Sequence, residues 1–247
     1  MCRMILALGN FCAESVFNAA LAMSEGIFAR HEKPIPRHPN GWGAVWRKSS
    51  SPDRLSIYRD IRSLGESMET MTFFKEMKTD FLAIHVRHAT LTHNQGIECT
   101  HPVTAEGTAV PWYLLHNGFL PTIYRHLGRE KSLFDSREYF DFIVPREGDR
   151  LSHQDEIVSK LEALEPGGSS ANAIVINPHR AYAIHWFPRD TPYPQYFTMH
   201  QGRTQEATFI SSEPIPFLTH NWSALIRGQI LEFPLQPLPA VSLTSAR

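Results

Sequence analysis

A cysteine directly after the first methionine is the residue best suited to chemistry in this chain of 247 residues. Methionine aminopeptidases remove Met1 when the next side chain is small, and Cys2 qualifies. Its removal would give Cys2 both a thiol and a free α-amine, which titrates at about 7.7–8.0. Such an amine can serve as the base for a neighbouring nucleophile. The position of Cys2 therefore favours an N-terminal nucleophile, whereas the alternative is a small buried apolar residue.

Four further motifs follow Cys2 in a fixed order. They are Asn-Gly-Trp-Gly at 40–43, His-Val-Arg-His-Ala-Thr at 85–90, Thr-His-Pro at 100–102 and His-Asn-Gly at 116–118. Each motif is weak by itself, but the order and spacing of all of them resemble the class II glutamine amidotransferases. These proteins are the N-terminal-nucleophile hydrolases that use a cysteine. The small stand-alone members are the nearest in pattern.

The resemblance implies roles for four residues of this chain. Cys2 would be the nucleophile, with its own α-amine moving the proton. The Arg87 guanidinium would bind the α-carboxylate of a glutamine-like substrate through two parallel hydrogen bonds. The side-chain amide of Asn117 and the backbone N–H of Gly118 would form the oxyanion hole, where one donor is worth about 10²–10³ in rate.

Further substrate contacts are implied by the same motifs. His88 and Thr90 belong to the Arg87 motif, and Trp42 belongs to the Asn-Gly-Trp-Gly loop. The family also places an acidic residue on the substrate's α-amine, within Ser/Thr-Asp-Ser/Thr-Glu. Residues 134–138, Phe-Asp-Ser-Arg-Glu, depart from that pattern at the first and fourth positions. We assign the role to Asp135, and the resemblance extends to a Ser-Glu-Pro segment at 212–214.

A metal site is the main competing interpretation of the histidines. The chain has 13 of them, and the five that cluster in sequence are His85, His88, His93, His101 and His116. On a strand, the first two of these point to opposite faces, which makes them a poor chelating pair. No acidic residue has the offset of a His-Glu-x-x-His zinc motif. We therefore expect no metal, and we expect His101 and His116 to shape the site.

Composition excludes several classes of partner. The net charge is −1, and the Lys and Arg residues are scattered, so we expect neither a nucleic-acid surface nor a membrane patch. Three cysteines are too few and too dispersed for a disulfide framework. These features favour a cytoplasmic protein, and the resemblance implies no cofactor.

The elements that must position these residues follow from hydrophobic periodicity and turn signals. Helices are predicted at 13–29, 66–78, 136–144 and 154–164. Strands are predicted at 3–8, 43–46, 55–58, 81–87, 112–115, 173–176, 181–186, 196–199, 207–210 and 229–233. Cys2 would start the first strand, Arg87 would end another, and the strand at 112–115 would deliver Asn117.

Two groups of strands flanked by helices indicate a layered α+β fold. The resemblance implies the specific form, a four-layer αββα sandwich of the N-terminal-nucleophile hydrolase type. We expect one amidotransferase domain over residues 1–247, with a Pro-rich tail at 234–247.

Three functions are consistent with this pattern. The first, which we favour, is an amidohydrolase that cleaves the side-chain amide of glutamine or a small γ-glutamyl amide through a Cys2 thioester. The second is a glutaminase subunit that supplies ammonia to a separate synthetase partner. The third is a catalytically idle binding module on the same scaffold.

Overall fold

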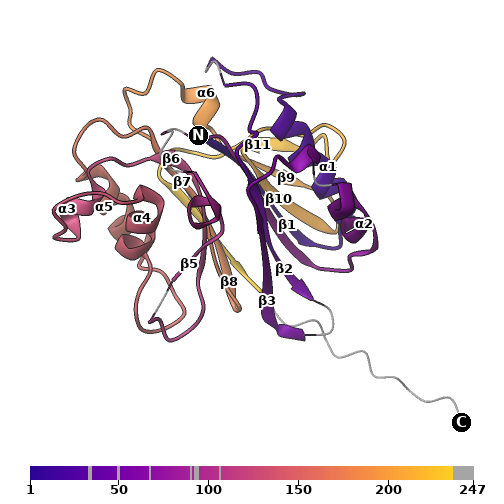
Figure 1. The fold of residues 1–247 in the computed structure, drawn as a ribbon, viewed down its shortest axis with the longest axis horizontal. Helices are drawn as coiled ribbons and strands as arrows, with labels where there is room; N and C mark the ends of the chain where they lie inside the picture. The colour runs from indigo at the N-terminus through magenta and orange to yellow at the C-terminus, as the bar shows by residue number, and fades with distance from the viewer. Residues whose placement is uncertain are drawn as a thin grey trace, which may run out of the picture.

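Two β-sheets pack face to face, and helices cover the outer face of each sheet (Figure 1). This computed structural model describes residues 1–32, 35–48, 51–66, 68–89, 91, 95–105 and 107–235. The resulting order of layers, αββα, confirms the predicted fold class. One apolar core lies between the two sheets, and one further core lies under the helices on each side.

The larger sheet has the strand order β11-β9-β10-β1-β4-β2-β3. Its strands are β1 (Cys2–Gly9), β2 (Trp42–Lys48), β3 (Ser51–Asp60), β4 (Phe81–Arg87), β9 (His200–Arg203), β10 (Ala207–Ser211) and β11 (Trp222–Ala224). β1 is central because both of its faces are apolar. Ile5 and Ala7 pack under the helices, whereas Met4 and Leu6 face the other sheet.

The smaller sheet has the order β12-β8-β7-β6-β5. Its strands are β5 (Val103–Thr104), β6 (Tyr113–Phe119), β7 (Ser170–Asn177), β8 (Arg180–His185) and β12 (Gln229–Pro234). β6 crosses β1 in the sheet interface, so the start of β1 meets the later part of β6. This crossing places Cys2 against the His-Asn-Gly motif.

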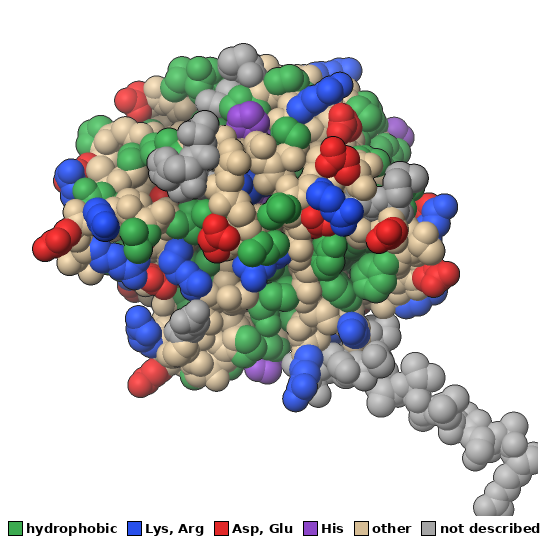
Figure 2. All heavy atoms as spheres, viewed as in Figure 1, with side chains coloured by type: hydrophobic (Ala, Val, Ile, Leu, Met, Phe, Trp, Pro, Cys, Tyr) green, Lys and Arg blue, Asp and Glu red, His purple; other side chains and the backbone are tan. Residues whose placement is uncertain are grey.

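Two helices, α1 (Ala13–Glu25) and α2 (Met68–Glu76), cover the larger sheet. The smaller sheet is covered by α3 (Ile123–His126), α4 (Asp135–Ile143) and α5 (Gln154–Glu162). A short helix, α6 (Pro194–Phe197), lies near the N-terminus (Figure 1), and two 3₁₀ turns occupy Leu64–Glu66 and Ile97–Cys99. No helix in the described ranges is long and apolar enough to cross a membrane. On the face in Figure 2, acidic and basic side chains are interspersed.

Most predicted elements are present, and the differences have local causes. The first helix ends at Glu25, not at residue 29, because Gly26 adopts a left-handed φ of 69° and caps it. The strand predicted at 196–199 is wrong, because Tyr196 and Phe197 belong to α6, where Pro194 occupies the first turn. The tail prediction starts within β12, and residues 236–247 lie outside the described part.

Candidate active site

Cys2 begins β1 and lies opposite Arg87 in the register of β1 and β4. Its backbone N–H donates to Oδ1 of Asn117, on the other sheet, over 2.8 Å. All three residues are buried. A thiol, a guanidinium and a carboxamide from three strands therefore meet at one edge of the sheet interface.

A small cavity of about 30 Å³ opens beside the thiol. Its lining residues are Met1, Cys2, Arg87, His88, Leu91, His101, His116, Gly118, Phe119, Phe134, Asp135 and Ser136. Five of the predicted site residues are among them. The volume is enough for about two water molecules, and Met1 forms part of the wall.

The surroundings of Cys2 favour its thiolate. Burial raises the pKa of the Cys2 thiol, but His85, the chain's amino terminus and Arg87 together outweigh that effect and lower the pKa to about 6. The thiolate is the nucleophilic form of cysteine. At neutral pH, Cys2 is thus set up to attack an electrophile.

Three histidines are buried near Cys2, and only two of them were expected to shape the site. Nε2 of His85 lies 3.1 Å from the carbonyl oxygen of His116, and the rings of His85 and His101 are 4.2 Å apart. A carbonyl can only accept, so this Nε2 carries a hydrogen. Sequence analysis missed the approach of His85 to the thiol. The available signal was its place two residues before Arg87, on the same strand face.

His116 is held by serines on two elements. Nδ1 lies 2.9 Å from the Ser136 hydroxyl and Nε2 lies 3.3 Å from the carbonyl oxygen of Ser170. Burial lowers the pKa of His116. The neutral ring therefore donates to Ser170 and accepts from Ser136, which ties β6 to α4 and β7.

The Asn-Gly-Trp-Gly loop positions Arg87 through its first two residues. The Arg87 N–H donates to the carbonyl of Gly41 and the Asn40 N–H donates to the carbonyl of Arg87, both over 2.9 Å. The Asn40 side chain also accepts from the Ala89 N–H at 3.0 Å, and the backbone carbonyl oxygen of Asn40 lies 3.4 Å from Nη1 of Arg87. Sequence analysis named Trp42 from this loop and missed Asn40.

Trp42 is not brought to the cavity, contrary to the prediction. It is fully buried on the helix side of the larger sheet, with Phe17 and Phe74 at ring distances of 6.3 Å. Its side chain is therefore part of the core. Thr90 lies outside the described residues, as does His93.

Two charged residues complete the surroundings. Asp135 starts α4 at the cavity, and its Oδ2 accepts from the Leu120 N–H at 3.0 Å. Arg3 is 1% exposed. Its guanidinium stacks on the Tyr196 ring at 3.8 Å and donates to the Tyr196 carbonyl. Arg3 therefore holds α6.

No group of three or more His, Cys, Asp or Glu side chains within the described ranges is arranged to hold a metal ion. Of the three buried histidines near Cys2, His85 and His116 have ring nitrogens close to carbonyl oxygens and a hydroxyl, as described above.

Comparison with known proteins gives matches to solved structures alone. No family model and no curated protein matches the sequence. The glutamine phosphoribosylpyrophosphate amidotransferase from B. subtilis is 15% identical, with a TM-score of 0.62, covering 95% of this chain and 49% of that one. A structure described as the allosteric regulatory enzyme of purine biosynthesis is 18% identical, with a TM-score of 0.65, covering 94% and 47%.

A third match has nearly the same length as this chain. It is a glutamine aminotransferase class-II domain protein from Silicibacter pomeroyi, 14% identical, with a TM-score of 0.54, covering 94% of both chains. The chain has the fold of the class II glutamine amidotransferases. It spans about half the length of the first two matches. At such low identity the likeness concerns the fold, and the chemistry has to be argued from the site.

Within this amidotransferase fold, the close approach of β6 and β7 requires glycine at position 118. A Cβ on Gly118 would lie 1.8 Å from the carbonyl oxygen of Ser170 and 2.5 Å from Nε2 of His116. The missing side chain lets β6 pass close to both groups, with Asn117 beside the N-terminal residue of β1.

Proposed function

We propose that this chain is an amidohydrolase that cleaves the side-chain amide of glutamine or of a γ-glutamyl amide, with Cys2 as the nucleophile after removal of Met1. The observation that carries the proposal is the contact between the Cys2 nitrogen and Oδ1 of Asn117, with Arg87 opposite Cys2 in the neighbouring strand. The nitrogen that becomes the α-amine is thus already fixed beside the thiol.

The proposed reaction begins with attack of the Cys2 thiolate on the amide carbon. The tetrahedral oxyanion would be stabilised by the Asn117 side-chain N–H and the Gly118 backbone N–H. Oδ1 of Asn117 accepts from the Cys2 nitrogen, so the side-chain NH₂ of Asn117 points away from that nitrogen. The α-amine of Cys2 would then protonate the leaving nitrogen, giving a γ-glutamyl thioester that water hydrolyses.

Substrate binding would use the two charged residues on the cavity. Arg87 would bind the α-carboxylate and Asp135 the α-amine of the glutamyl group, since both line the cavity beside Cys2. His88 lines the same cavity. The backbone clamp by Asn40 and Gly41 would keep the guanidinium in place. We further propose that residues 1–247 form a single catalytic domain.

Intact mass before and after incubation with a diazo-ketone analogue of glutamine tests the proposal. We expect loss of Met1 and one adduct on the Cys2 peptide, with release of glutamate from glutamine. Cys2→Ala should abolish the adduct, whereas the matched control Cys12→Ala, at an exposed cysteine, should keep it. Hydrolysis that survives in Cys2→Ala would exclude the proposed mechanism.

A glutaminase module that supplies ammonia to another catalytic unit is the second candidate. It is favoured by the two matches of which this chain covers only about half. Glutaminase activity that rises when a co-purified partner is added would support it. The idle module, the third hypothesis, would be supported by retention of Met1, because the Cys2 nitrogen is then an amide and cannot carry a proton to the leaving group.

A further inference from the structure

The place now filled by Met1 lies between the catalytic cavity and a second, larger pocket. Met1 is buried in an apolar cluster with Tyr196 and Phe197, against which Ile35, Phe187 and Tyr193 also pack. Its sulfur lies 3.8 Å from the hydroxyl of Ser169. Removal of Met1 would therefore leave an apolar space directly beside the nitrogen of Cys2.

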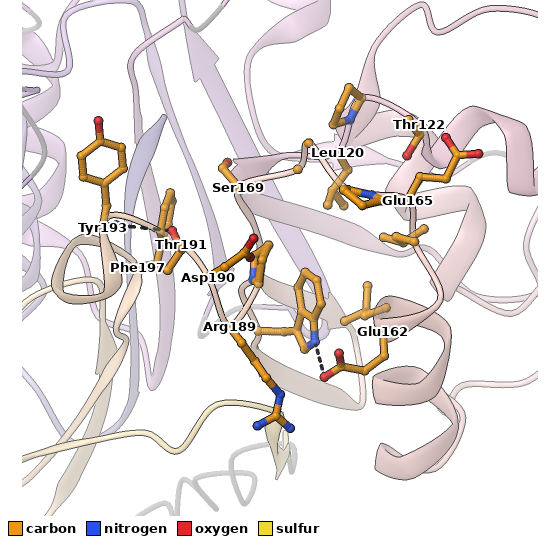
Figure 3. Close-up of a pocket in the computed structure, with 18 of the residues that line it drawn as sticks. Leu120, Thr122, Glu162, Glu165, Ser169, Arg189, Asp190, Thr191, Tyr193 and Phe197 are labelled. Atoms are coloured by element: carbon orange, nitrogen blue, oxygen red, sulfur yellow. Dashed lines mark hydrogen bonds between the residues drawn. The ribbon is translucent and has the colours of Figure 1, made fainter.

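The larger pocket shares its walls with that space. It has a volume of about 510 Å³, within the range of small-molecule sites. Ser169, Tyr193 and Phe197, which neighbour Met1, all line it, and Leu120 lies across from them (Figure 3). Removal of Met1 would therefore leave a space that borders the catalytic cavity and these three residues of the larger pocket.

The chemistry of amide cleavage assigns an occupant to the space. The α-amine of Cys2 must reach the leaving nitrogen to protonate it, so that nitrogen has to lie beside the former Met1 peptide bond. Arg87 and Asp135 would hold the glutamyl part of the substrate in the smaller, catalytic cavity. The substituent on the leaving nitrogen therefore extends away from them, through the place of Met1 and towards the larger pocket.

The walls on that path are aromatic and fixed. Arg3 donates to the Tyr196 carbonyl at 2.8 Å and Asn172 donates to the Phe197 carbonyl at 2.5 Å, which anchors α6 to both sheets. Trp186 forms another wall, and Glu162 beside it lies 2.7 Å from Arg227. Arg189 and Asp190 also line the pocket (Figure 3). The rings of Trp186, Tyr193 and Phe197 suit an aromatic body on the leaving group.

We propose that the larger pocket binds the leaving group, and that this chain prefers γ-glutamyl amides whose amine carries an aromatic ring. The inference rests on the proposed function, because it requires a Cys2 α-amine in the place now taken by a peptide bond. Glutamine, whose leaving group is ammonia, would leave the pocket empty.

Three substrates and one blocking variant test this pocket. For the Met1-free protein, we expect kcat/KM for γ-glutamylphenylalanine to exceed that for γ-glutamylglycine by about tenfold or more. Ser169→Phe, which places a ring between the two cavities, should lower the γ-glutamylphenylalanine value by about tenfold and the glutamine value by less than about twofold. Tyr193→Ala should reduce the aromatic preference without blocking the path.

The outcomes separate the two proposals. Equal kcat/KM values for the phenylalanine and glycine substrates, in a protein that cleaves both, would overturn the pocket assignment and leave the proposed function standing. An equal loss for glutamine and γ-glutamylphenylalanine in folded Ser169→Phe would overturn it too. A Met1-free protein that cleaves no substrate and takes no diazo-ketone label would remove the proposed function, and this inference with it.

Discussion

The Cys2 thiol combines deep burial with a low pKa, two properties that normally oppose each other. Burial disfavours the thiolate, so the neighbouring positive groups must supply more than the lost hydration. Cys99 has the opposite balance, since burial raises the pKa of its thiol despite the partial compensation from Arg87. The difference between the two cysteines arises from the groups around them.

The pH dependence of alkylation measures the difference in pKa between the Cys2 and Cys99 thiols. The thiolate reacts, so a lowered pKa moves labelling to lower pH. In a Cys12→Ser background that retains Met1, we expect Cys2 to label with a midpoint near pH 6. Cys99 should label only above the pH at which an ordinary cysteine thiol titrates. His85→Gln should move the Cys2 midpoint upward, because His85 lowers the pKa of that thiol. Peptide-resolved mass spectrometry gives both curves, and an unmoved midpoint would contradict the role of His85.

Arg87 offers a second test on a single side chain. If its guanidinium binds the substrate's α-carboxylate through two hydrogen bonds, Arg87→Lys should raise KM about 10- to 100-fold, the scale of a lost charged hydrogen bond. The thermal midpoint should change little, and Arg59→Lys, at a partly exposed position of β3, is the matched control. Near-normal kinetics in Arg87→Lys would mean that another group binds the substrate's α-carboxylate.

At the scale of elements, the glycines of the Asn-Gly-Trp-Gly and His-Asn-Gly motifs allow neighbouring backbone segments to pack closely. A Cβ on Gly43 would lie 2.0 Å from the carbonyl oxygen of His101, so the segment that carries His101 packs directly on β2. This contact joins the Asn-Gly-Trp-Gly loop to the Thr-His-Pro segment. Glycine is thus required there for spacing between elements, which sequence analysis did not foresee.

Gly43→Ala should therefore cost about 2–3 kcal/mol of unfolding free energy, as overpacking typically does. Gly65→Ala is the matched control, because its nearest side-chain atoms lie 3.6 Å from the added Cβ, and we expect a change of less than about 0.5 kcal/mol. Urea unfolding of both variants measures the difference. Equal stabilities would mean that the His101 segment can move away without loss.

Much of the element pattern, but less of the site, follows from sequence. Continuous burial along β1 and β4 gives both strands an unbroken apolar run that makes them predictable, and the motif order predicts that Cys2, Arg87 and Asn117 converge. Periodicity does not say which strands are neighbours, so the approach of His85, on β4, to the thiol on β1 was missed. Tyr196 was misplaced on a strand, since aromatic residues favour strands until a proline starts a helix.

For the whole molecule, the interface between the two sheets determines whether the site exists, because Cys2 and Asn117 belong to different sheets. Ile174, on β7, is fully buried in that interface. Ile174→Ala should cost about 2–5 kcal/mol of unfolding free energy. Ile226→Ala, at a side chain that is 76% exposed, should have little effect. A small loss in Ile174→Ala would mean that the interface repacks.

Because the Met1 amine is buried in the folded chain, the proposed removal of Met1 has to precede folding. Its ammonium group donates to the carbonyl of His88 at 2.6 Å, and the residue is only 7% exposed. An aminopeptidase has to take the free amine and the first peptide bond into its own active site, which the folded chain does not permit. Excision must therefore take place while the chain is still emerging from the ribosome, before β4 pairs with β1. Rapid synthesis that outruns the aminopeptidase would accumulate folded protein in which the Cys2 nitrogen stays an amide and cannot carry a proton.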